Sequence, residues 1–139
     1  MIANMCLVLL LAIANDITCP PPPPPIDEVC FLITTYWVFD ENGIAVPFGG
    51  QADSDPNSTA NGTHITPESE NQIAAIPFDM VGSMVYLSNG LVLYGADTFG
   101  DLERQGGLFW SDYFDQWVIG VDILTDDYYS YLDCGGEIR

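Results

Sequence analysis

Short apolar runs alternate along this chain with polar stretches rich in Gly, Asn, Asp and Ser. A long run of β-branched and aromatic residues covers residues 29–39 and ends in the turn sequence Asp-Glu-Asn-Gly. Residues 117–124 form a second run, Trp-Val-Ile-Gly-Val-Asp-Ile-Leu, and residues 128–132 form a shorter third one. Apolar runs that are bounded by turn residues are typical of β-strands.

The clearest local signal is a hairpin over residues 84–96. Two apolar runs flank Asn89-Gly90. Asn-Gly is the preferred pair for a type I′ turn, which needs φ > 0 at both central residues. The second run continues into Asp97-Thr-Phe-Gly, so the sequence places a carboxylate on a loop at the end of a strand.

The segments between these runs carry weaker signals. Residues 47–62 and 101–107 indicate polar loops, residues 111–116 indicate one helical turn, and residues 71–75 are too short to assign. Neither an amphipathic helix nor the spacing of a βαβ unit is visible. We therefore expect an all-β domain of six or seven short strands, either a small barrel or a sandwich.

The N-terminus predicts a secretory signal over residues 1–14. Its apolar stretch is too short to span a bilayer, and Ala12-Ile-Ala14 matches an A-x-A cleavage site. We therefore expect a secreted protein, extracellular or periplasmic, whose mature chain begins at Asn15. The signal segment is the one part for which a membrane contact is expected.

A proline-rich linker is expected over residues 15–27, before a folded domain over residues 28–139. The linker contains six consecutive prolines at residues 20–25, the proline tract. Such a tract is a stiff polyproline spacer of about 3.1 Å per residue. The alternative is that it serves as the ligand of a proline-binding module.

The cysteines predict one disulfide within the domain. Cleavage of the signal would leave Cys19, Cys30 and Cys134, and an odd number allows at most one bridge within a chain. Cys30 and Cys134 bracket the domain, and a bridge between them would stabilise the fold by about 4–5 kcal/mol through loop closure. With no CxxC pair and one His, a zinc site is not expected.

The charge balance is strongly acidic. The chain has 20 acidic side chains, two basic ones and a formal net charge of −18. This excludes a binder of nucleic-acid phosphates and argues against docking on an anionic membrane. The acid excess fits solubility in a salty or extracellular medium. Binding of a divalent cation is the alternative, but Asp53-Ser-Asp-Pro-Asn57 matches a calcium loop poorly, because it lacks the Gly and carries His64 at the last ligand position.

Residues 29–124 resemble the 3D domain, which is named for three aspartates. Six motifs carry the resemblance in this order: Thr35-Tyr-Trp37, Thr59-Ala-Asn-Gly-Thr63, Ile73-Ala-Ala75, Gly82-Ser-Met-Val-Tyr-Leu87, Ala96-Asp-Thr-Phe-Gly100 and Val121-Asp-Ile-Leu124. The resemblance implies a small six-stranded double-psi β-barrel, similar to the domains of the rare lipoprotein A and expansin kind. The same barrel carries the active site of the membrane-bound lytic transglycosylase A.

The resemblance also implies roles for two aspartates. Asp97 matches the aspartate of the family's Asp-Thr-Gly-Gly turn. Asp122 matches the aspartate of the following Ile-Asp-Leu strand, the general acid/base of the lytic enzymes. The chain departs from the pattern at Phe99, where a Gly is usual. The gap between the two aspartates is also longer than in the family, which makes Asp115 a rival for the second position.

The implied chemistry needs one acid. In a lytic transglycosylase the sugar's own 6-hydroxyl attacks the anomeric carbon, so no second carboxylate has to activate water. The acid must be protonated near neutral pH, and both burial and a like-charged neighbour raise a carboxyl pKa. We expect Asp97 and Asp122 close together in one groove under aromatic side chains. The expected substrate-binding residues are Trp110, Tyr113, Trp117 and Thr63.

The sequence thus favours a secreted enzyme that cleaves peptidoglycan or another polysaccharide as a lytic transglycosylase, without a cofactor or a metal. A non-catalytic glycan-binding or wall-loosening module is the alternative, and a virion or surface structural protein is the third possibility. A binding module needs only an aromatic platform, whereas a structural protein would bury its aromatics between subunits. The tryptophans can also be core residues, and Asp97 can be a simple turn cap.

Overall fold

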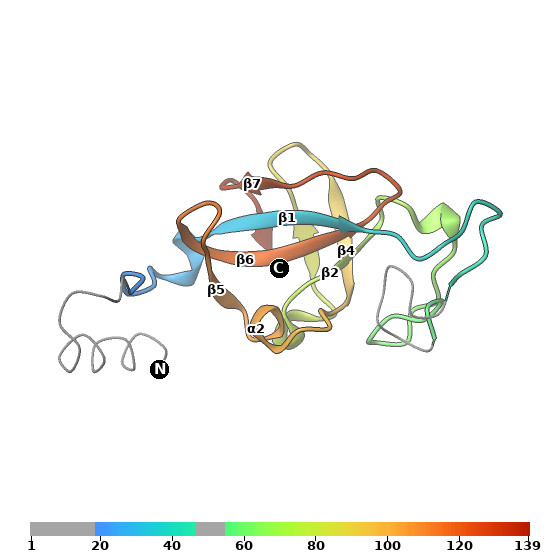
Figure 1. Cartoon of the computed structure of the whole chain (residues 1–139), viewed down its shortest axis with the longest axis horizontal. Coiled ribbons are helices and arrows are strands. Elements are labelled where there is room, and N and C mark those ends of the chain that lie inside the picture. Colours follow the sequence, from blue (N-terminus) through green and yellow to red (C-terminus); the bar gives the residue numbers. More distant parts are fainter. Residues whose placement is uncertain (1–18, 47–54) are drawn as a thin grey trace.

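The computed structural model describes residues 19–46 and 55–139, so the predicted signal segment and part of the calcium-like loop lie outside the described residues. Within these ranges the chain forms eight strands and one short α-helix (Figure 1). The elements are β1 (Cys30–Tyr36), β2 (Ile73–Ala75), β3 (Met84–Tyr86), β4 (Val92–Asp97), α2 (Leu102–Gln105), β5 (Leu108–Ser111), β6 (Gln116–Leu124), β7 (Tyr131–Asp133) and β8 (Glu137–Ile138). Short 3₁₀ helices cover Ile26–Glu28, Pro67–Ser69 and Phe78–Met80.

All eight strands belong to one mixed sheet. Its order is β7-β1-β6-β2-β4-β3-β8, and β5 pairs with β6 as a branch. The expected mainly β architecture is confirmed. The number of strands is eight rather than six, and the sheet is open rather than a closed barrel.

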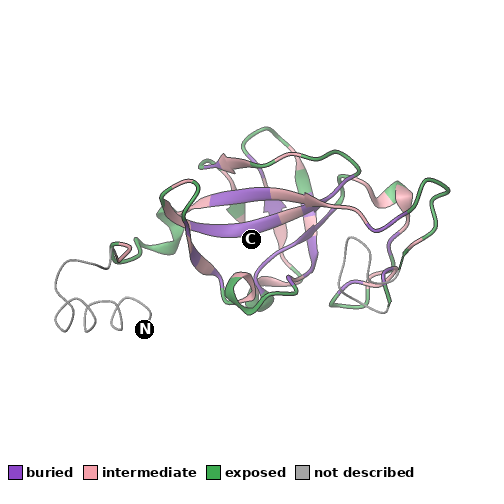
Figure 2. Cartoon of the chain, viewed as in Figure 1, coloured by how far each residue is buried: buried purple, intermediate pink, exposed green. Residues whose placement is uncertain are grey.

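Strand β6 is the centre of the sheet. It runs parallel to β1 from the pair Cys30–Val118 to the pair Tyr36–Leu124, and antiparallel to β5 at its start and to β2 at its end. Its side chains at 119, 121 and 123 belong to the main hydrophobic core. Because successive side chains of a strand point to opposite faces, Asp122 lies on the other face. Figure 2 shows β6 buried over most of its length, whereas β1 is buried at residues 31–33 and intermediate elsewhere.

The two end strands of the sheet are held close together by the chain itself. Strand β7 pairs with β1 at one end of the sheet, and β8 pairs with β3 at the other end. Only residues 134–136 separate β7 from β8 in the chain. The predicted disulfide between Cys30 and Cys134 is confirmed and ties this link to the start of β1. The sheet therefore curls around its core although its ends are not paired with each other.

The predicted hairpin is confirmed, but its turn is of another type. Strands β3 and β4 pair antiparallel from Met84–Tyr94 to Tyr86–Val92. The N–H of Leu87 donates to the carbonyl of Leu91 (2.9 Å), which leaves a three-residue loop. Gly90 has φ 92°, whereas Asn89 is not among the described residues with positive φ. A type I′ turn is thus wrong, and the loop matches the common three-residue type with Gly in the left-handed region.

Two of the weaker local predictions are also wrong. The expected loop over residues 101–107 contains α2, whose N-cap Asp101 accepts a hydrogen bond from the N–H of Arg104 (3.2 Å). The expected helical turn over residues 111–116 is the tight connection between β5 and β6. In it Asp115 adopts φ 55°, a left-handed conformation that Asp tolerates better than most residues.

A second, smaller hydrophobic core holds the long segment between β1 and β2 in place. Side chains of this segment pack against the start of β2 and against the C-terminal ends of β4 and β6. The buried members are Val38, Phe39, Ile65, Ile73, Ala96 and Leu124. This packing brings the Thr-Ala-Asn-Gly-Thr loop of residues 59–63 to the end of β4, where Asn61 N–H donates to the carbonyl of Ala96 (3.2 Å).

Candidate functional site

Four residues in register across neighbouring strands form the centre of the candidate site. Thr34 of β1 pairs with Asp122 of β6, and Ala75 of β2 pairs with both Asp122 and Asp97 of β4. Paired residues share a face of the sheet, so the two aspartates flank Ala75 on the same face. Their backbones lie about 10 Å apart, which is twice the spacing of adjacent strands. The structure thus places the two acids that the motifs singled out on one face of the sheet, two strands apart.

A bulge in β4 turns Asp97 toward this face. The register shifts between Ala74, which pairs with Gly95, and Ala75, which pairs with Asp97. One extra residue, Ala96, is accommodated between these pairs and packs into the second core. Without the shift, Ala96 would stand opposite Ala75. Bulges commonly re-aim side chains next to functional sites.

Asp97 is a buried and well-anchored carboxylate with 5% of its surface exposed. Its Oδ1 accepts hydrogen bonds from the N–H groups of Ala60 (3.1 Å) and Thr98 (2.9 Å), and its Oδ2 accepts from the hydroxyl of Tyr36 (3.3 Å). Asp97 therefore ties the 59–63 loop to β4. Thr63, an expected substrate-binding residue, bonds within that loop, where its hydroxyl donates to Asn61 Oδ1 (2.7 Å).

Asp122 differs from Asp97 because it faces a pocket. The pocket has a volume of about 260 Å³, and its lining residues are Thr34, Thr35, Arg104, Asp122, Tyr128, Tyr129 and Ser130. The Thr34 hydroxyl donates to Asp122 Oδ1 (2.8 Å). Burial raises the pKa of Asp122 above its ordinary value, the Thr34 hydrogen bond and the Arg104 charge oppose this rise, and the Asp97 charge adds to it. The pocket thus contains a carboxyl group that holds its proton to higher pH than an ordinary aspartate.

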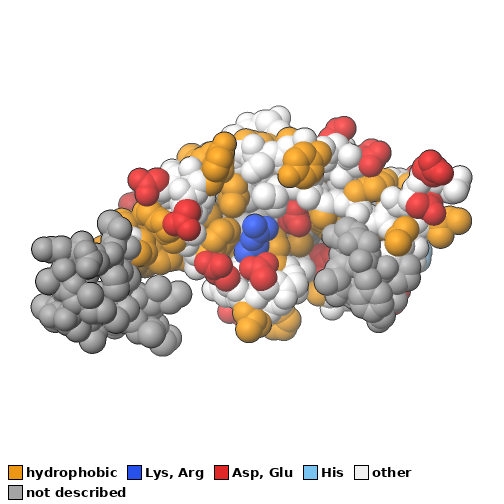
Figure 3. Space-filling view, in the orientation of Figure 1, with side chains coloured by type: hydrophobic (Ala, Val, Ile, Leu, Met, Phe, Trp, Pro, Cys, Tyr) orange, Lys and Arg blue, Asp and Glu red, His pale blue; other side chains and the backbone are white. Residues whose placement is uncertain are grey.

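Arg104 is a site residue that the sequence analysis missed. It lies in α2, with its guanidinium 5.8 Å from the ring centroid of Phe99 and 5.7 Å from that of Phe109. The available signal was its rarity, because it is one of two basic residues in the chain. Figure 3 shows a basic side chain near the centre of this face with acidic side chains around it.

Phe99, the departure from the family motif, covers β6 beside Asp122. A Cβ atom on Gly120 would lie 2.9 Å from Phe99 Cζ, so the ring sits against the bare backbone of Gly120. Gly120 and Asp122 are two positions apart and therefore share a face of β6. The Phe99 ring therefore covers the face of β6 immediately N-terminal to Asp122.

Tyr36 is another residue that the sequence analysis did not assign to the site. Its hydroxyl bonds to Asp97, and burial raises its pKa well above the ordinary value, with the charges of Asp97 and Asp122 adding to the rise. Its signal was its place in the Thr35-Tyr-Trp37 motif. Tyr36 therefore stays neutral and donates its hydrogen bond to Asp97.

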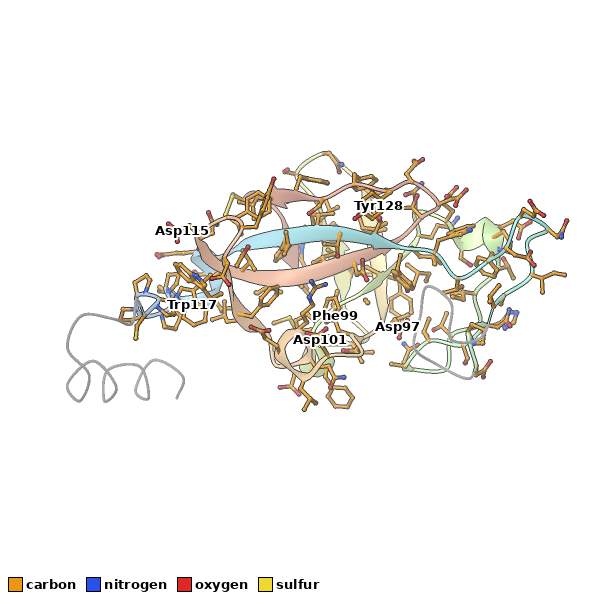
Figure 4. The ribbon with its side chains drawn as sticks, viewed as in Figure 1. Asp97, Phe99, Asp101, Asp115, Trp117 and Tyr128 are labelled. Atoms are coloured by element: carbon orange, nitrogen blue, oxygen red, sulfur yellow. A yellow bond between two sulfur atoms is a disulfide. The ribbon has the colours of Figure 1, made fainter. Side chains whose placement is uncertain are left out.

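The predicted aromatic residues and Asp115 do not lie over the acids. Trp110 and Trp117 face each other across β5 and β6 with ring centroids 5.8 Å apart, and Tyr113 and Asp115 lie in the connection between these strands. Asp122 follows Trp117 by five residues, about 17 Å along the strand. Figure 4 shows Trp117 and Asp115 at one end of the molecule and Asp97 well away from them. The expected cover of the acids by Trp110, Tyr113 and Trp117 is therefore wrong, and Asp115 is not part of their site.

The described part of the chain holds no group of three or more His, Cys, Asp or Glu side chains placed to bind a metal ion. Among the same residues, no helix has the length and apolar character that crossing a membrane requires. Comparison with protein-family models, with curated proteins and with solved structures finds no match to this chain.

Proposed function

We propose that this protein cleaves a cell-wall glycan, with peptidoglycan as the first candidate, and that Asp122 is the general acid/base of a lytic transglycosylase-type reaction. The observation that carries the proposal is the placement of Asp122 in a pocket, with a hydroxyl donor on one side and the buried Asp97 two strands away. The order of the motifs, which resembles the 3D domain, supports the same reaction.

The reaction needs only one proton donor. Asp122 protonates the glycosidic oxygen, the bond between this oxygen and the anomeric carbon breaks, and the leaving sugar departs as an alcohol. The 6-hydroxyl of the remaining sugar bonds to the anomeric carbon, and its proton passes to the Asp122 carboxylate. The product carries a 1,6-anhydro ring, and the acid is restored.

Asp97 fits a supporting role in this scheme. Asp97 accepts two hydrogen bonds from backbone N–H groups and one from the Tyr36 hydroxyl, and these bonds fix the position of its carboxylate. Its negative charge helps Asp122 to retain a proton. Hydrolysis would instead need a second carboxylate placed to activate water or to attack the sugar.

We also propose that the sheet is a form of the double-psi β-barrel. Two parallel pairs, β1–β6 and β2–β4, occur in a sheet that is otherwise antiparallel. The short link between β7 and β8 also curls the sheet toward closure. Secretion through the N-terminal segment would bring the protein to its substrate.

A non-catalytic glycan-binding module is the second candidate. Tyr128 is 98% exposed and stands with Tyr129 on the same pocket as Asp122. Exposed aromatic rings have an apolar face on which a sugar can stack, and such stacking does not need the acid. The pocket can therefore hold a glycan without cleaving it.

Product analysis separates these functions. Purified protein, residues 15–139, is incubated with insoluble peptidoglycan, and the soluble products are identified by mass spectrometry. Products that end in 1,6-anhydro sugar support the proposal, whereas reducing-end products indicate a hydrolase. Protein that sediments with the glycan and releases nothing indicates the binding module. Protein that neither binds nor cleaves contradicts both functions.

A further inference from the structure

The proline tract lies against the tryptophan pair at the start of β6. The indole Nε1–H of Trp117 donates to the carbonyl oxygen of Pro21 (2.7 Å). Three prolines of the tract also line a hollow of about 280 Å³ that is shared with both tryptophans. Its proline and tryptophan members are Pro21, Pro22, Pro24, Trp110 and Trp117. Figure 4 shows Trp117 beside this N-terminal stretch.

The fold places the tract at this position. A 3₁₀ helix, Ile26–Glu28, links the tract to β1, and Glu28 N–H donates to the Pro25 carbonyl (2.9 Å). Cys30 at the start of β1 pairs with Val118, the residue after Trp117. The chain that enters β1 therefore passes the tryptophan pair at close range.

The contact has the chemistry of polyproline recognition. Pro25 has φ −55° and ψ 145°, which are polyproline II values. A polyproline II helix has no internal hydrogen bonds, so its carbonyl groups can accept hydrogen bonds from a partner. Its stiffness lowers the entropic cost of binding. The indole N–H is a donor only, and two edge-to-face rings provide an apolar groove beside it.

The charge around the hollow also suits a neutral ligand. Glu28 and Asp115 are the charged residues that line it, and both are acidic. An acidic rim repels anionic ligands, whereas a proline segment brings no charge of its own. The tryptophan pair therefore fits a proline segment better than it fits an anionic polymer.

We infer that the Trp110–Trp117 surface is a polyproline-binding site whose occupant is the chain's own proline tract. The chain carries both the ligand and its receptor. The tract acts as a strap that lies on the domain, not as a free spacer that holds the domain away. This site is separate from the acid pocket at the other end of β6 and does not depend on the proposed reaction.

The first test measures hydrogen exchange of the indole Nε1–H groups by NMR in the full chain. It is compared with a chain in which residues 20–25 are replaced by alternating Gly and Ser. We expect the Trp117 indole to exchange at least about tenfold faster after the replacement, because its hydrogen bond is lost. The Trp37 indole, outside the contact, serves as the internal control and keeps its rate. Equal exchange of Trp117 in both chains would overturn the inference.

The second test adds acetylated hexaproline to both chains and measures binding by calorimetry. We expect binding to the Gly/Ser chain to be at least about tenfold tighter than to the intact chain, because the tethered tract competes at a high effective concentration. In the Gly/Ser background, Trp117→Phe should weaken binding by about fivefold through loss of one hydrogen bond. The matched control Trp37→Phe should leave it unchanged. Absence of binding to the Gly/Ser chain, or unchanged binding by Trp117→Phe, would refute the site.

Discussion

The two ends of β6 carry different kinds of side chain and lie in different surroundings. At the C-terminal end, Asp122 puts a partly buried carboxyl group into a pocket, where Thr34 donates a hydrogen bond to it. At the N-terminal end, Trp117 pairs with Trp110 and donates its indole N–H to the proline tract. The first end uses buried charge, and the second uses ring surface and one donor.

This difference shows how one strand can keep two groups of side chains apart. A strand is nearly rigid, and the five residue steps from Trp117 to Asp122 separate these two residues by about 17 Å. Acids and aromatics that are neighbours in the sequence thus lie in different places, and we propose different ligands for them. Residue types that belong together in a motif have to be checked against the register of the sheet before they are assigned to one site.

The largest expected effect distinguishes the two ends by activity. Asp122→Asn keeps the shape of the side chain but removes the proton, so we expect glycan cleavage to fall by about 10²–10⁴-fold. Asp115→Asn, the matched change at the aromatic end, should leave the rate unchanged. The rates are measured as soluble product released per unit time. Equal losses in both variants would place the chemistry elsewhere.

The disulfide anchors the aromatic end, because Cys30 lies opposite Val118. Replacing both Cys30 and Cys134 by Ser opens a loop with a sequence separation of 104 residues, and we expect the free energy of unfolding to fall by about 4–5 kcal/mol. Denaturant unfolding of the variant and of the parent checks this value. The parent measured with reductant should match the variant, and a change below about 1 kcal/mol would contradict the loop-closure account.

Gly120 tests the packing at the acid end. In Gly120→Ala the new Cβ would lie 2.9 Å from Phe99 Cζ, so the ring must move, and we expect a loss of about 1–3 kcal/mol in the free energy of unfolding. Gly100→Ala is the control, because a Cβ there has nothing within 4 Å. Thermal and denaturant unfolding of both variants measure the difference. Similar stabilities for the two variants would show that Phe99 does not rest on Gly120.

The pH dependence of stability tests the burial of the Asp122 carboxyl group. The folded pKa of Asp122 is raised above its unfolded value, so the folded state binds the proton more tightly. The stability that this proton contributes is present below an unfolded pKa of about 3.9 and is lost as pH rises to the folded pKa. Asp122→Asn should therefore gain stability relative to the parent as pH rises through this window, as measured by denaturant unfolding at a series of pH values. Cleavage should also fail above the folded pKa, by about tenfold per pH unit.

The smallest expected effect concerns the hydrogen bond of Tyr36. Tyr36→Phe removes the donor to Asp97 Oδ2, and we expect a loss of about 1 kcal/mol in the free energy of unfolding. Tyr113→Phe at the aromatic end changes a side chain that is 89% exposed and should have no measurable effect. Chemical unfolding resolves the two variants. A neutral Tyr36→Phe would mean that the Tyr36 hydroxyl is not needed to satisfy Asp97.

Several features of this protein were readable in the sequence because their signals are local. The runs at residues 29–39 and 117–124 contain β1 and β6, and Asn89-Gly90 marks the hairpin. The bracketing cysteines identified the disulfide. Local patterns were insufficient for β2 and β8, because such short strands show no period and no turn pair such as Asn89-Gly90 marks them. They also assigned the wrong structure to residues 111–116, where strand pairing outweighs the local preference for a turn of helix.

The two sites were decided by the tertiary structure. Asp97 and Asp122 share a face because β2 lies between their strands and a bulge turns Asp97, and neither fact is encoded near either residue. Arg104 lines the acid pocket, and its guanidinium lies over the rings of Phe99 and Phe109, which flank α2 in the chain. The proline tract meets Trp117, 96 residues away in the chain, because β1 and β6 run parallel from the same end. Local sequence sets which residues form strands, whereas contacts between distant strands set which side chains meet.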